Sequence, residues 1–514
     1  MSESGNGQTG GSTVGEGFHS SPAVQQAIAT ITGELREHQQ AITGVRGPVD
    51  PAHHESFEAF MERAAGVRGR PLLYPYIGSG IGNGPYVEMM DGSVKLDMIC
   101  GIGVHFFGHS DPDLTAAALE GATSDIWMQG HLMQNEDAIG FASTLLEQAR
   151  KTSDLAHVFL CNSGAMANEN CIKVCYQKHE PASRVLAFSH CFMGRTVTMA
   201  QLGDSAGGRS GIPLSTLVDY VPFYDHVAAR RMSAGDVSGS TRYIDMCVWH
   251  LQEYIQRYPK QHACFIFELV QGEGGFNTAL PEFHRELMQV CKDHNIAVWS
   301  DEVQTFGRTE QMFCFEALGL GEWVDVCAVG KMSQVCAAIY TSEYNPRPGL
   351  LSGTFLGSTT SLRVGRRALE RLRDGGYYGS DGKIAQHFRM FKERTQALID
   401  KHPDWFPHPA SVHELVSGYG GMMRFTPFGG EKDPILKLCK QLYEDGLIAF
   451  YCGHDPFHVR MLPPLGVMEE HHWDAVFEIF ETSMSKVYAS LPKFEAPSLR
   501  PMHASPHAAR DAGD

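Results

Sequence analysis

The sequence lacks several features that define whole classes of protein. It contains no run of about 18 apolar residues, so we expect no transmembrane helix. Its N-terminus, "MSESGNGQTGGSTVGEG", has neither the basic region nor the apolar region of a secretory signal. Lysines and arginines form no long run and the formal net charge is -17, so neither a nucleic acid nor an anionic membrane is expected as a partner.

Cysteine pairs and clusters of metal ligands are also missing. The 13 cysteines are an odd number, form no CxxC motif and lie in core-like runs such as "FLC" and "DVCAVG". The adjacent histidines of "PAHHE" and "EEHHW" do not have the i,i+4 spacing of a metal site on a helix. We therefore expect no metal, and reduced thiols of the kind found in a cytoplasmic protein.

The composition is that of a large globular protein. The chain has 514 residues, of which 43% are hydrophobic and 20% charged, and this length allows about two or three domains. Residues 1–18 are rich in Gly, Ser and Thr and predict a disordered tail. The predicted division is a tail at 1–20, an N-terminal segment at 21–104, a large domain at 105–350, a smaller C-terminal α+β domain at 351–492 and a flexible tail at 493–514.

Between the tails, short apolar runs alternate with helical patterns. Strands are predicted at 156–161, 184–189, 263–270, 296–300 and 324–330, with helices from about residue 165 to 178 and from Pro281 onward. This alternation predicts a mostly parallel sheet covered by helices on both faces, which is an α/β fold. Ligands of such sheets bind beyond the carboxyl ends of the strands, so the residues that follow each strand are the candidates for a site.

The first of these strands ends in a turn of small residues. Ser163, Gly164 and Ala165 open the helix that follows it. Free backbone N–H groups and the helix dipole favour an anion at such a position, most simply a phosphate. The alternative is an N-cap serine followed by a glycine that permits tight packing.

Two residues that follow later strands predict a carbonyl cofactor. Lys331 follows a buried strand, where loss of solvation lowers the pKa of an amine and makes it a nucleophile toward carbonyls; a lysine that extends to solvent is the alternative. Asp301 ends another strand and needs a positive partner there, unless it only caps a helix. Pyridoxal 5'-phosphate (PLP) supplies that partner in its pyridine nitrogen. Phe192 is then a candidate to stack on the ring, and Gln304 to reach the ring hydroxyl.

Seven motifs together resemble one known family. They are, in chain order, "NSGAMANENCIK", "FMGRT", "QGEGG", "DEVQTFGRT", "GK", "GTFLGS" and "VRMLPPL", and the resemblance covers roughly residues 75–490. The family is that of class III (ω-amino acid) aminotransferases of PLP fold type I. It implies that residues 105–350 form the PLP-binding domain. It also implies a Schiff base at Lys331, a pyridine contact from Asp301, phosphate contacts from Gly164 and Ala165, and ring stacking by Phe192.

The resemblance further assigns residues to substrates and to a partner subunit. Thr354 matches a threonine that reaches the phosphate of the neighbouring subunit, which implies a homodimer with sites at the interface. Arg195 matches an arginine that binds the carboxylate distal to the reacting amine, and Arg460 matches one that binds the α-carboxylate of glutamate or 2-oxoglutarate. Glu273 matches a glutamate that covers Arg460 while the amine donor is bound. Taken singly, these three charged residues are better explained as ordinary surface ion pairs.

The implied reaction moves an amino group from an ω-amino acid to 2-oxoglutarate, which becomes glutamate. The stretch "GKMSQVC" is similar to L-lysine 6-aminotransferases and "TFLGS" to 4-aminobutyrate aminotransferases, so lysine leads slightly over 4-aminobutyrate and over acetylornithine or ornithine as the donor. Met193, Leu356 and Ser358 depart from common family patterns, and all concern the substrate side.

Two alternatives to this reaction stay open at the level of the sequence. One is a different PLP reaction on the same scaffold, such as an aminomutase or a decarboxylating transaminase. The other is a protein without catalytic activity that keeps the fold as a scaffold, although a scaffold needs none of Lys331, Asp301 and Gln304.

Overall fold

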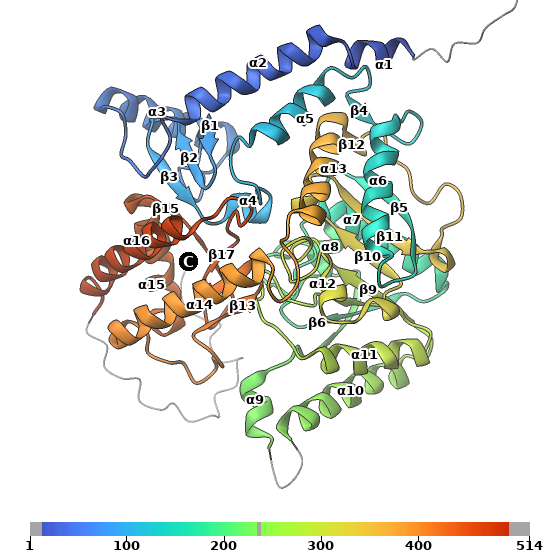
Figure 1. Cartoon of the computed structure of the whole chain (residues 1–514). Helices are drawn as coiled ribbons and strands as arrows, with labels where there is room; N and C mark the ends of the chain where they lie inside the picture. Colours follow the sequence, from blue (N-terminus) through green and yellow to red (C-terminus); the bar gives the residue numbers. More distant parts are fainter. Residues whose placement is uncertain (1–12, 234–237, 493–514) are drawn as a thin grey trace, which may run out of the picture.

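The computed structural model describes residues 13–233 and 238–492 (Figure 1). One large sheet and its helices form one side of the molecule, and the N- and C-terminal segments pack together on the other side. The large sheet uses strands from the middle of the chain, whereas the smaller sheets combine strands from its two ends.

The large sheet has seven strands in the order β5-β11-β10-β9-β8-β6-β7. They are β5 (Leu155–Cys161), β6 (Arg184–Phe188), β7 (Leu217–Val221), β8 (His262–Phe267), β9 (Ala297–Asp301), β10 (Val326–Val329) and β11 (Cys336–Thr341). Only β11 runs antiparallel to its neighbours in this sheet. The prediction of a mostly parallel sheet in an α/β fold is confirmed, although β7 and β11 were not predicted.

Both faces of this sheet are buried, as expected for a parallel sheet between two layers of helices. In β6, Val185 and Ala187 belong to one apolar cluster, and Leu186 and Phe188 belong to another. The helix α7 (Gly164–Lys178) packs on the first face, and α10 (Gly239–Arg257) and α11 (Pro281–Asp293) pack on the second. The helices predicted from residue 165 and from Pro281 are thus confirmed.

The two ends of the chain share the smaller sheets. β1 (Gly78–Asn83), β2 (Tyr86–Met89) and β3 (Val94–Asp97) pair in that order, and β15 (Leu447–Ile448) from the C-terminal segment pairs with β3. A separate antiparallel sheet has the order β13-β14-β17-β16. It consists of β13 (Val416–Tyr419), β14 (Met422–Phe425), β16 (Phe450–Cys452) and β17 (His458–Met461), with α14 (Lys383–Lys401), α15 (Lys432–Asp445) and α16 (Glu470–Ala489) packed around it.

The prediction of a disordered tail at 1–20 is wrong for its described part. Residues 1–12 lie outside the described residues, but α1 (Val14–His19) is helical. The side chains of Thr13 and Glu16 form the reciprocal hydrogen bonds of a capping box, which stabilises this short helix despite its glycines. The helices α2 (Pro22–Gln39) and α3 (Pro51–Arg68) follow. The tail predicted at 493–514 also lies outside the described residues.

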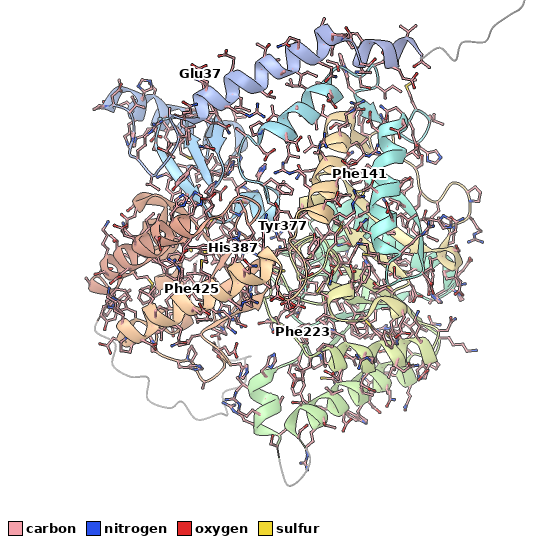
Figure 2. The ribbon with its side chains drawn as sticks, viewed as in Figure 1. Glu37, Phe141, Phe223, Tyr377, His387 and Phe425 are labelled. Carbon is pink, nitrogen blue, oxygen red and sulfur yellow. The ribbon has the colours of Figure 1, made fainter. Side chains whose placement is uncertain are left out.

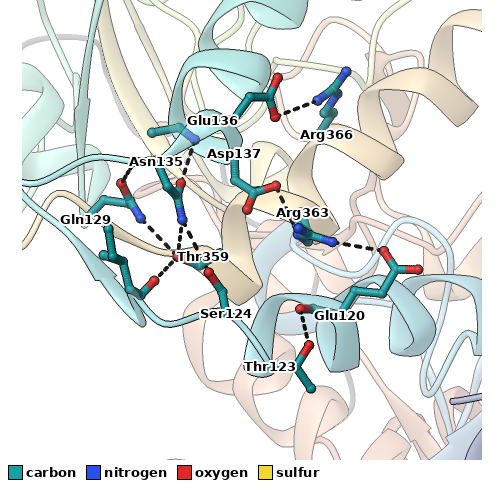
Figure 3. Close-up of polar contacts among 12 residues, drawn as sticks. Glu120, Thr123, Ser124, Gln129, Asn135, Glu136, Asp137, Thr359, Arg363 and Arg366 are labelled. Atoms are coloured by element: carbon teal, nitrogen blue, oxygen red, sulfur yellow. Dashed lines mark hydrogen bonds and ion pairs between the residues drawn. The ribbon is translucent and has the colours of Figure 1, made fainter. Parts of the chain in front are cut away.

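A polar network joins three helices beside the large sheet (Figure 3). Arg363 of α13 (Thr359–Asp374) pairs with Glu120 of α5 (Pro112–Ala122) at 3.2 Å and with Asp137 of α6 (Glu136–Ala149) at 2.9 Å. Thr359 accepts a hydrogen bond of 3.0 Å from Gln129. These contacts hold β12 (Gly357–Ser358) against β4 (Met128–Gln129) and so fix the loop that precedes β12.

The described residues contain no disulfide bond, no membrane-spanning helix and no cluster of metal ligands. All 13 cysteines are buried and unpaired. Within residues 13–233 and 238–492, no helix is long and apolar enough to cross a bilayer. The same residues contain no group of three or more His, Cys, Asp or Glu side chains arranged to hold a metal ion.

Candidate active site

A cavity of about 180 Å³ lies beyond the carboxyl ends of the central strands of the large sheet. Seven residues that the sequence marked as site candidates share it: Gly164, Ala165, Phe192, Glu273, Asp301, Gln304 and Lys331. Of the strands that precede them, β10, β9, β8 and β6 are consecutive neighbours in the sheet, and β11 separates β5 from β10, so groups far apart in the chain meet at one edge. Further lining residues are Asn168, Met193, Gly194, Glu268, Val270, Gly272, Val303 and Thr305.

Asp301 is the last residue of β9 and is only 7% exposed. Its Oδ1 accepts a hydrogen bond from the backbone N–H of Val303 at 2.9 Å, and its Oδ2 accepts one from Asn168 Nδ2 at 2.8 Å. No Lys, Arg or His side chain of the described residues lies within ion-pair distance of it. Burial raises the pKa of Asp301, and the charge of Lys331 offsets only part of that rise. The carboxylate thus faces the cavity without a cationic partner.

Lys331 follows β10 directly and lines the same cavity. Its backbone has a φ of 52°, in the left-handed region that residues other than glycine rarely adopt. Burial lowers the pKa of Lys331, and the charges of Asp301 and Glu273 oppose that effect. A lowered pKa favours the neutral amine, which is the form that attacks carbonyl carbon. The strained backbone aims this side chain at the cavity instead of at solvent.

The N-terminus of α7 provides free backbone donors at the cavity. Ser163 caps the helix by accepting a hydrogen bond of 3.2 Å from the N–H of Met166, so the N-cap alternative is correct for its side chain. The N–H groups of Gly164 and Ala165 donate to none of the described residues and remain available for an anion. Gly164 is required here, because a Cβ on it would lie 2.6 Å from Val303.

Glu268 is a cavity residue that the sequence prediction missed. Strand β8 ends at Phe267, whereas the predicted strand ran to residue 270, so Glu268 was counted as part of the strand. Its carboxylate accepts hydrogen bonds from the backbone N–H groups of Phe192 at 3.0 Å and Gly272 at 3.1 Å. Burial, followed by the nearby charge of Asp301, raises the pKa of Glu268 to about 8. The hydrogen bond from Phe192 to Glu268 also holds the loop of Phe192 at the cavity.

Glu273 and Arg460 form an ion pair with one hydrogen bond beside the cavity. Arg460 Nη1 lies 2.8 Å from Glu273 Oε1, and Nη2 donates to Oε2 at 2.9 Å. The Arg460 side chain is fully buried in β17, whereas that of Glu273 is 31% exposed. The guanidinium lies against the rings of Phe276 and Phe450, at 5.7 and 5.3 Å from their centroids. The alternative of a surface ion pair is therefore wrong for these two residues.

Four candidate residues do not line the cavity: Ser163 and Arg460, described above, and Arg195 and Thr354. Arg195 is exposed and lies 5.2 Å from the centroid of the Phe192 ring, so it is linked to the site only through that ring. Thr354 is exposed in the loop before β12. That loop is fixed by hydrogen bonds such as that from His131 N–H to Gly353 O, at 2.8 Å. A single chain therefore does not bring Thr354 to its own cavity.

Comparison with known proteins identifies the family. The family model described as Aminotransferase class-III matches residues 77–484. The chain belongs to the class-III aminotransferase family. An acetylornithine aminotransferase of Bacillus anthracis is 28% identical over 411 residues, covering 79% of this chain and 94% of the relative. A diaminobutyrate–2-oxoglutarate transaminase of Vibrio parahaemolyticus is 24% identical over 442 residues, covering 84% and 98%.

Solved structures agree with this class-III aminotransferase in fold. A lysine aminotransferase from M. tuberculosis superposes with a TM-score of 0.70 at 21% identity, covering 83% of this chain and 99% of the other. An ornithine aminotransferase from Toxoplasma gondii also has a TM-score of 0.70, at 20% identity, covering 87% and 100%. The fold is PLP fold type I, and class-III aminotransferases depend on PLP.

The residues of this class-III aminotransferase fit that cofactor. A buried carboxylate without a cation, Asp301, suits a protonated ring nitrogen, and the free N–H groups at the start of α7 suit a phosphate. The Oε1 atom of Gln304 is buried without a hydrogen-bond partner and can accept from a ring hydroxyl. Phe192 and Val303 line the cavity with surfaces that can pack on the two ring faces.

Replacing Glu268 by Gln should change the pH dependence of stability of the cofactor-free protein. The folded pKa of about 8 lies above that of an unfolded glutamate, so this group stabilises the fold most at low pH and loses its contribution as pH rises through about 8. The melting temperature of Glu268→Gln relative to wild type should therefore rise by several degrees between pH 5 and pH 9. Glu393→Gln, at an exposed position on α14, should show no such trend. Parallel curves for Glu268→Gln and wild type would contradict this account.

Proposed function

We propose that this class-III aminotransferase transfers the terminal amino group of an ω-amino acid to 2-oxoglutarate, with glutamate as product. The observation that carries the proposal is the ion pair of Glu273 and Arg460 at the edge of the cavity that contains Lys331. If all substrates of an enzyme carried the same charges near the reacting amine, an arginine paired with a glutamate at this position would have no use. An enzyme that binds an uncharged chain next to the reacting amine in one half-reaction, and a dicarboxylate in the other, needs a guanidinium that pairs with a protein carboxylate in the first case and with the substrate in the second.

Bound PLP would supply an electron sink for the carbanion that forms when a proton leaves the substrate carbon. Lys331 would hold the cofactor covalently, and its amine would serve as the general base and acid that moves that proton. Its neutral form is favoured by burial in the cavity. Asp301 would keep the ring nitrogen protonated, because a cation opposite this carboxylate would remove the cost of burying it alone.

Glu273 is partly exposed and Arg460 is buried, and this difference suggests how the same site binds the two substrates in turn. While an amine donor with methylene groups at its reacting end occupies the cavity, Glu273 covers Arg460. When 2-oxoglutarate enters, its α-carboxylate replaces Glu273 on the guanidinium, whose planar shape suits a carboxylate. The 31% exposure of the Glu273 side chain leaves room for it to swing away, whereas Arg460 is fixed in its strand.

The class of donor is supported by the relatives and by Arg195. Acetylornithine, diaminobutyrate, lysine and ornithine, which appear in the names of the relatives and solved structures, all carry an amine far from a carboxylate. Arg195 is exposed beside Phe192, where it can bind a distal carboxylate. L-Lysine remains our first choice within this class, with ornithine-type donors and 4-aminobutyrate next.

The exposed apolar surface around the loop of Thr354 supports the proposal of a homodimer. Large side chains are exposed there, namely Trp127 at 71%, Met128 at 41%, Leu132 at 99%, Met133 at 63% and Phe355 at 61%. Trp127 directly precedes β4, and the others lie on β4, in the turn after it and in the loop hydrogen-bonded to that turn. A patch of this kind marks a protein–protein interface. Because Met166 at the start of α7 is also exposed, we propose that the partner subunit approaches the phosphate end of the cavity and contributes its Thr354.

Replacing Lys331 by Ala should abolish covalent attachment of PLP and reduce the transamination rate by about 10²- to 10⁴-fold, since the base that moves the proton is lost. The measurement is peptide mass spectrometry after borohydride reduction, combined with the rate of glutamate formation. Lys440→Ala, at an exposed position on α15, should leave both unchanged. A cofactor adduct that persists in Lys331→Ala would refute the assignment.

Replacing Arg460 by Ala should slow the half-reaction with 2-oxoglutarate by about 10- to 100-fold, because charge-assisted hydrogen bonds to the α-carboxylate are lost. The half-reaction with the amine donor should change much less. Single-turnover kinetics of each half-reaction separates the two. Arg460→Lys keeps the charge of this buried position and should give an intermediate effect on the 2-oxoglutarate half-reaction. Equal losses in both half-reactions would count against the proposed role of the pair.

Replacing Leu132 by Glu should weaken dimerisation by at least about 10-fold, because burial of one leucine side chain contributes roughly 1.5–3 kcal/mol. Sedimentation equilibrium measures the dimer dissociation constant, and PLP content should fall as the dimer dissociates. Val67→Glu introduces the same charge at an 85% exposed position outside the patch and is the control. An unchanged dissociation constant for Leu132→Glu would place the interface elsewhere.

A further inference from the structure

A second cavity lies on the other side of the loop that carries Glu273. Its volume is about 490 Å³, and Gln271, Gly274 and Asn277 line it, whereas Gly272 and Glu273 line the active-site cavity. Most of the remaining lining residues come from within 222–227, 411–414 and 454–458, and the others are Ser189, His190, Tyr243, Thr278, Ser417 and Arg424. Phe223, which Figure 2 labels beside the helices α9 (His226–Arg231) and α10, belongs to this lining. One loop therefore separates two cavities.

Arg424 in β14 lines this second cavity and is only 8% exposed. Its Nη1 lies 2.6 Å from Nε2 and 3.0 Å from Nδ1 of His458 and donates to the ring nitrogen that carries no proton, and its Nε is buried without a hydrogen-bond partner among the described residues. No carboxylate of residues 13–233 and 238–492 lies within ion-pair distance of it. Burial and the charge of Arg424 lower the pKa of His458, so the imidazole stays neutral. A buried guanidinium without an anion is costly, and an anionic ligand would remove that cost.

The acidic residues of the same lining lie at its exposed positions. Asp225, Glu414 and Asp455 all line the cavity and are exposed to solvent. Asp225 also caps α9, and the rings of His226 and His413, which line the cavity too, stack with their centroids 4.8 Å apart. The cavity thus has a positive charge at its buried end and negative charges at its open end. A carboxylate at one end of a ligand and an ammonium at the other complement this distribution.

We propose that this cavity is an accessory site for a free amino acid, whose carboxylate binds Arg424 and whose ammonium group faces the exposed acids. The ligand would contact Gln271, Gly274 and Asn277, and so stiffen the loop of Glu273. A second link is direct, since the N–H of Gly453 beside the cavity donates to the carbonyl of Glu273 at 3.0 Å. This coupling rests on the proposed role of Glu273; binding to Arg424 does not.

Equilibrium dialysis of the PLP-loaded enzyme with radiolabelled 4-(dimethylamino)butanoate tests the proposal. This probe carries a carboxylate and a charged amine, but its tertiary amine cannot form a Schiff base. At saturation, Arg424→Gln should bind one molecule fewer per chain than wild type. Pentanoate, which lacks the amine, should compete about 2- to 5-fold more weakly at the lost site, as expected for exposed charge pairs. Equal numbers of bound probe in Arg424→Gln and wild type would overturn the site, and equal competition would overturn its assignment to an amino acid.

A second variant keeps the test valid if Arg424→Gln does not fold. Ser417 pairs directly with Arg424 across β13 and β14 and lines the same cavity, so Ser417→Phe fills the space without removing the charge. It should also bind one molecule fewer, and a full count in this variant would contradict the proposal. Arg347→Gln, at a side chain 71% exposed, is the matched control and should bind as wild type does. The number of probe molecules bound per chain does not depend on the outcome of the Arg460→Ala kinetics. A failure of the proposed role of Glu273 and Arg460 is therefore distinguishable from a failure of the accessory site.

Discussion

The buried carboxylate of Asp301 is the constraint on which the site depends. This charge is 7% exposed and has no Lys, Arg or His side chain of the described residues within ion-pair distance, so its burial is unfavourable in an isolated chain. The two hydrogen bonds from Val303 and Asn168 orient it toward the cavity without neutralising it. A protonated pyridine nitrogen supplies the missing charge, and the same contact makes the ring an electron sink. The lysine, the N–H groups of α7 and the aromatic side chain surround the volume in which such a ring fits.

The sequence predicted the parts of the site that follow directly from strand ends. Lys331, Asp301 and the turn at Ser163 each come immediately after an apolar run, and parallel strands bring their carboxyl ends together. Glu268 was missed because a strand boundary was placed three residues too late, and Asn168 because a polar residue within a helix carries no local signal. Strand β11 was missed because its apolar run directly follows the active-site turn.

Long-range relations could not be read from local pattern. The contact between Glu273 and Arg460 joins two sheets from distant parts of the chain, and only the family resemblance suggested it before the structure placed the two side chains together. The exposure of Arg195 and of Thr354 likewise depends on packing. Thr354 gains a site only if a second subunit is present, as the exposed apolar patch around its loop suggests. The loop of Glu273 is another such case, because it forms part of the walls of two cavities. Arg460, paired with Glu273, lies beside the first cavity, and Arg424, which has no carboxylate partner among the described residues, lines the second.

The protonation state of the bound cofactor tests the central contact most directly. The nitrogen-15 chemical shift of PLP labelled at its ring nitrogen reports whether that atom carries a proton. The account predicts a protonated nitrogen in the wild-type enzyme, and loss of that proton at the same pH in Asp301→Asn, because the amide cannot stabilise a positive charge. An unprotonated nitrogen in the wild type, or the same shift in both proteins, would contradict it.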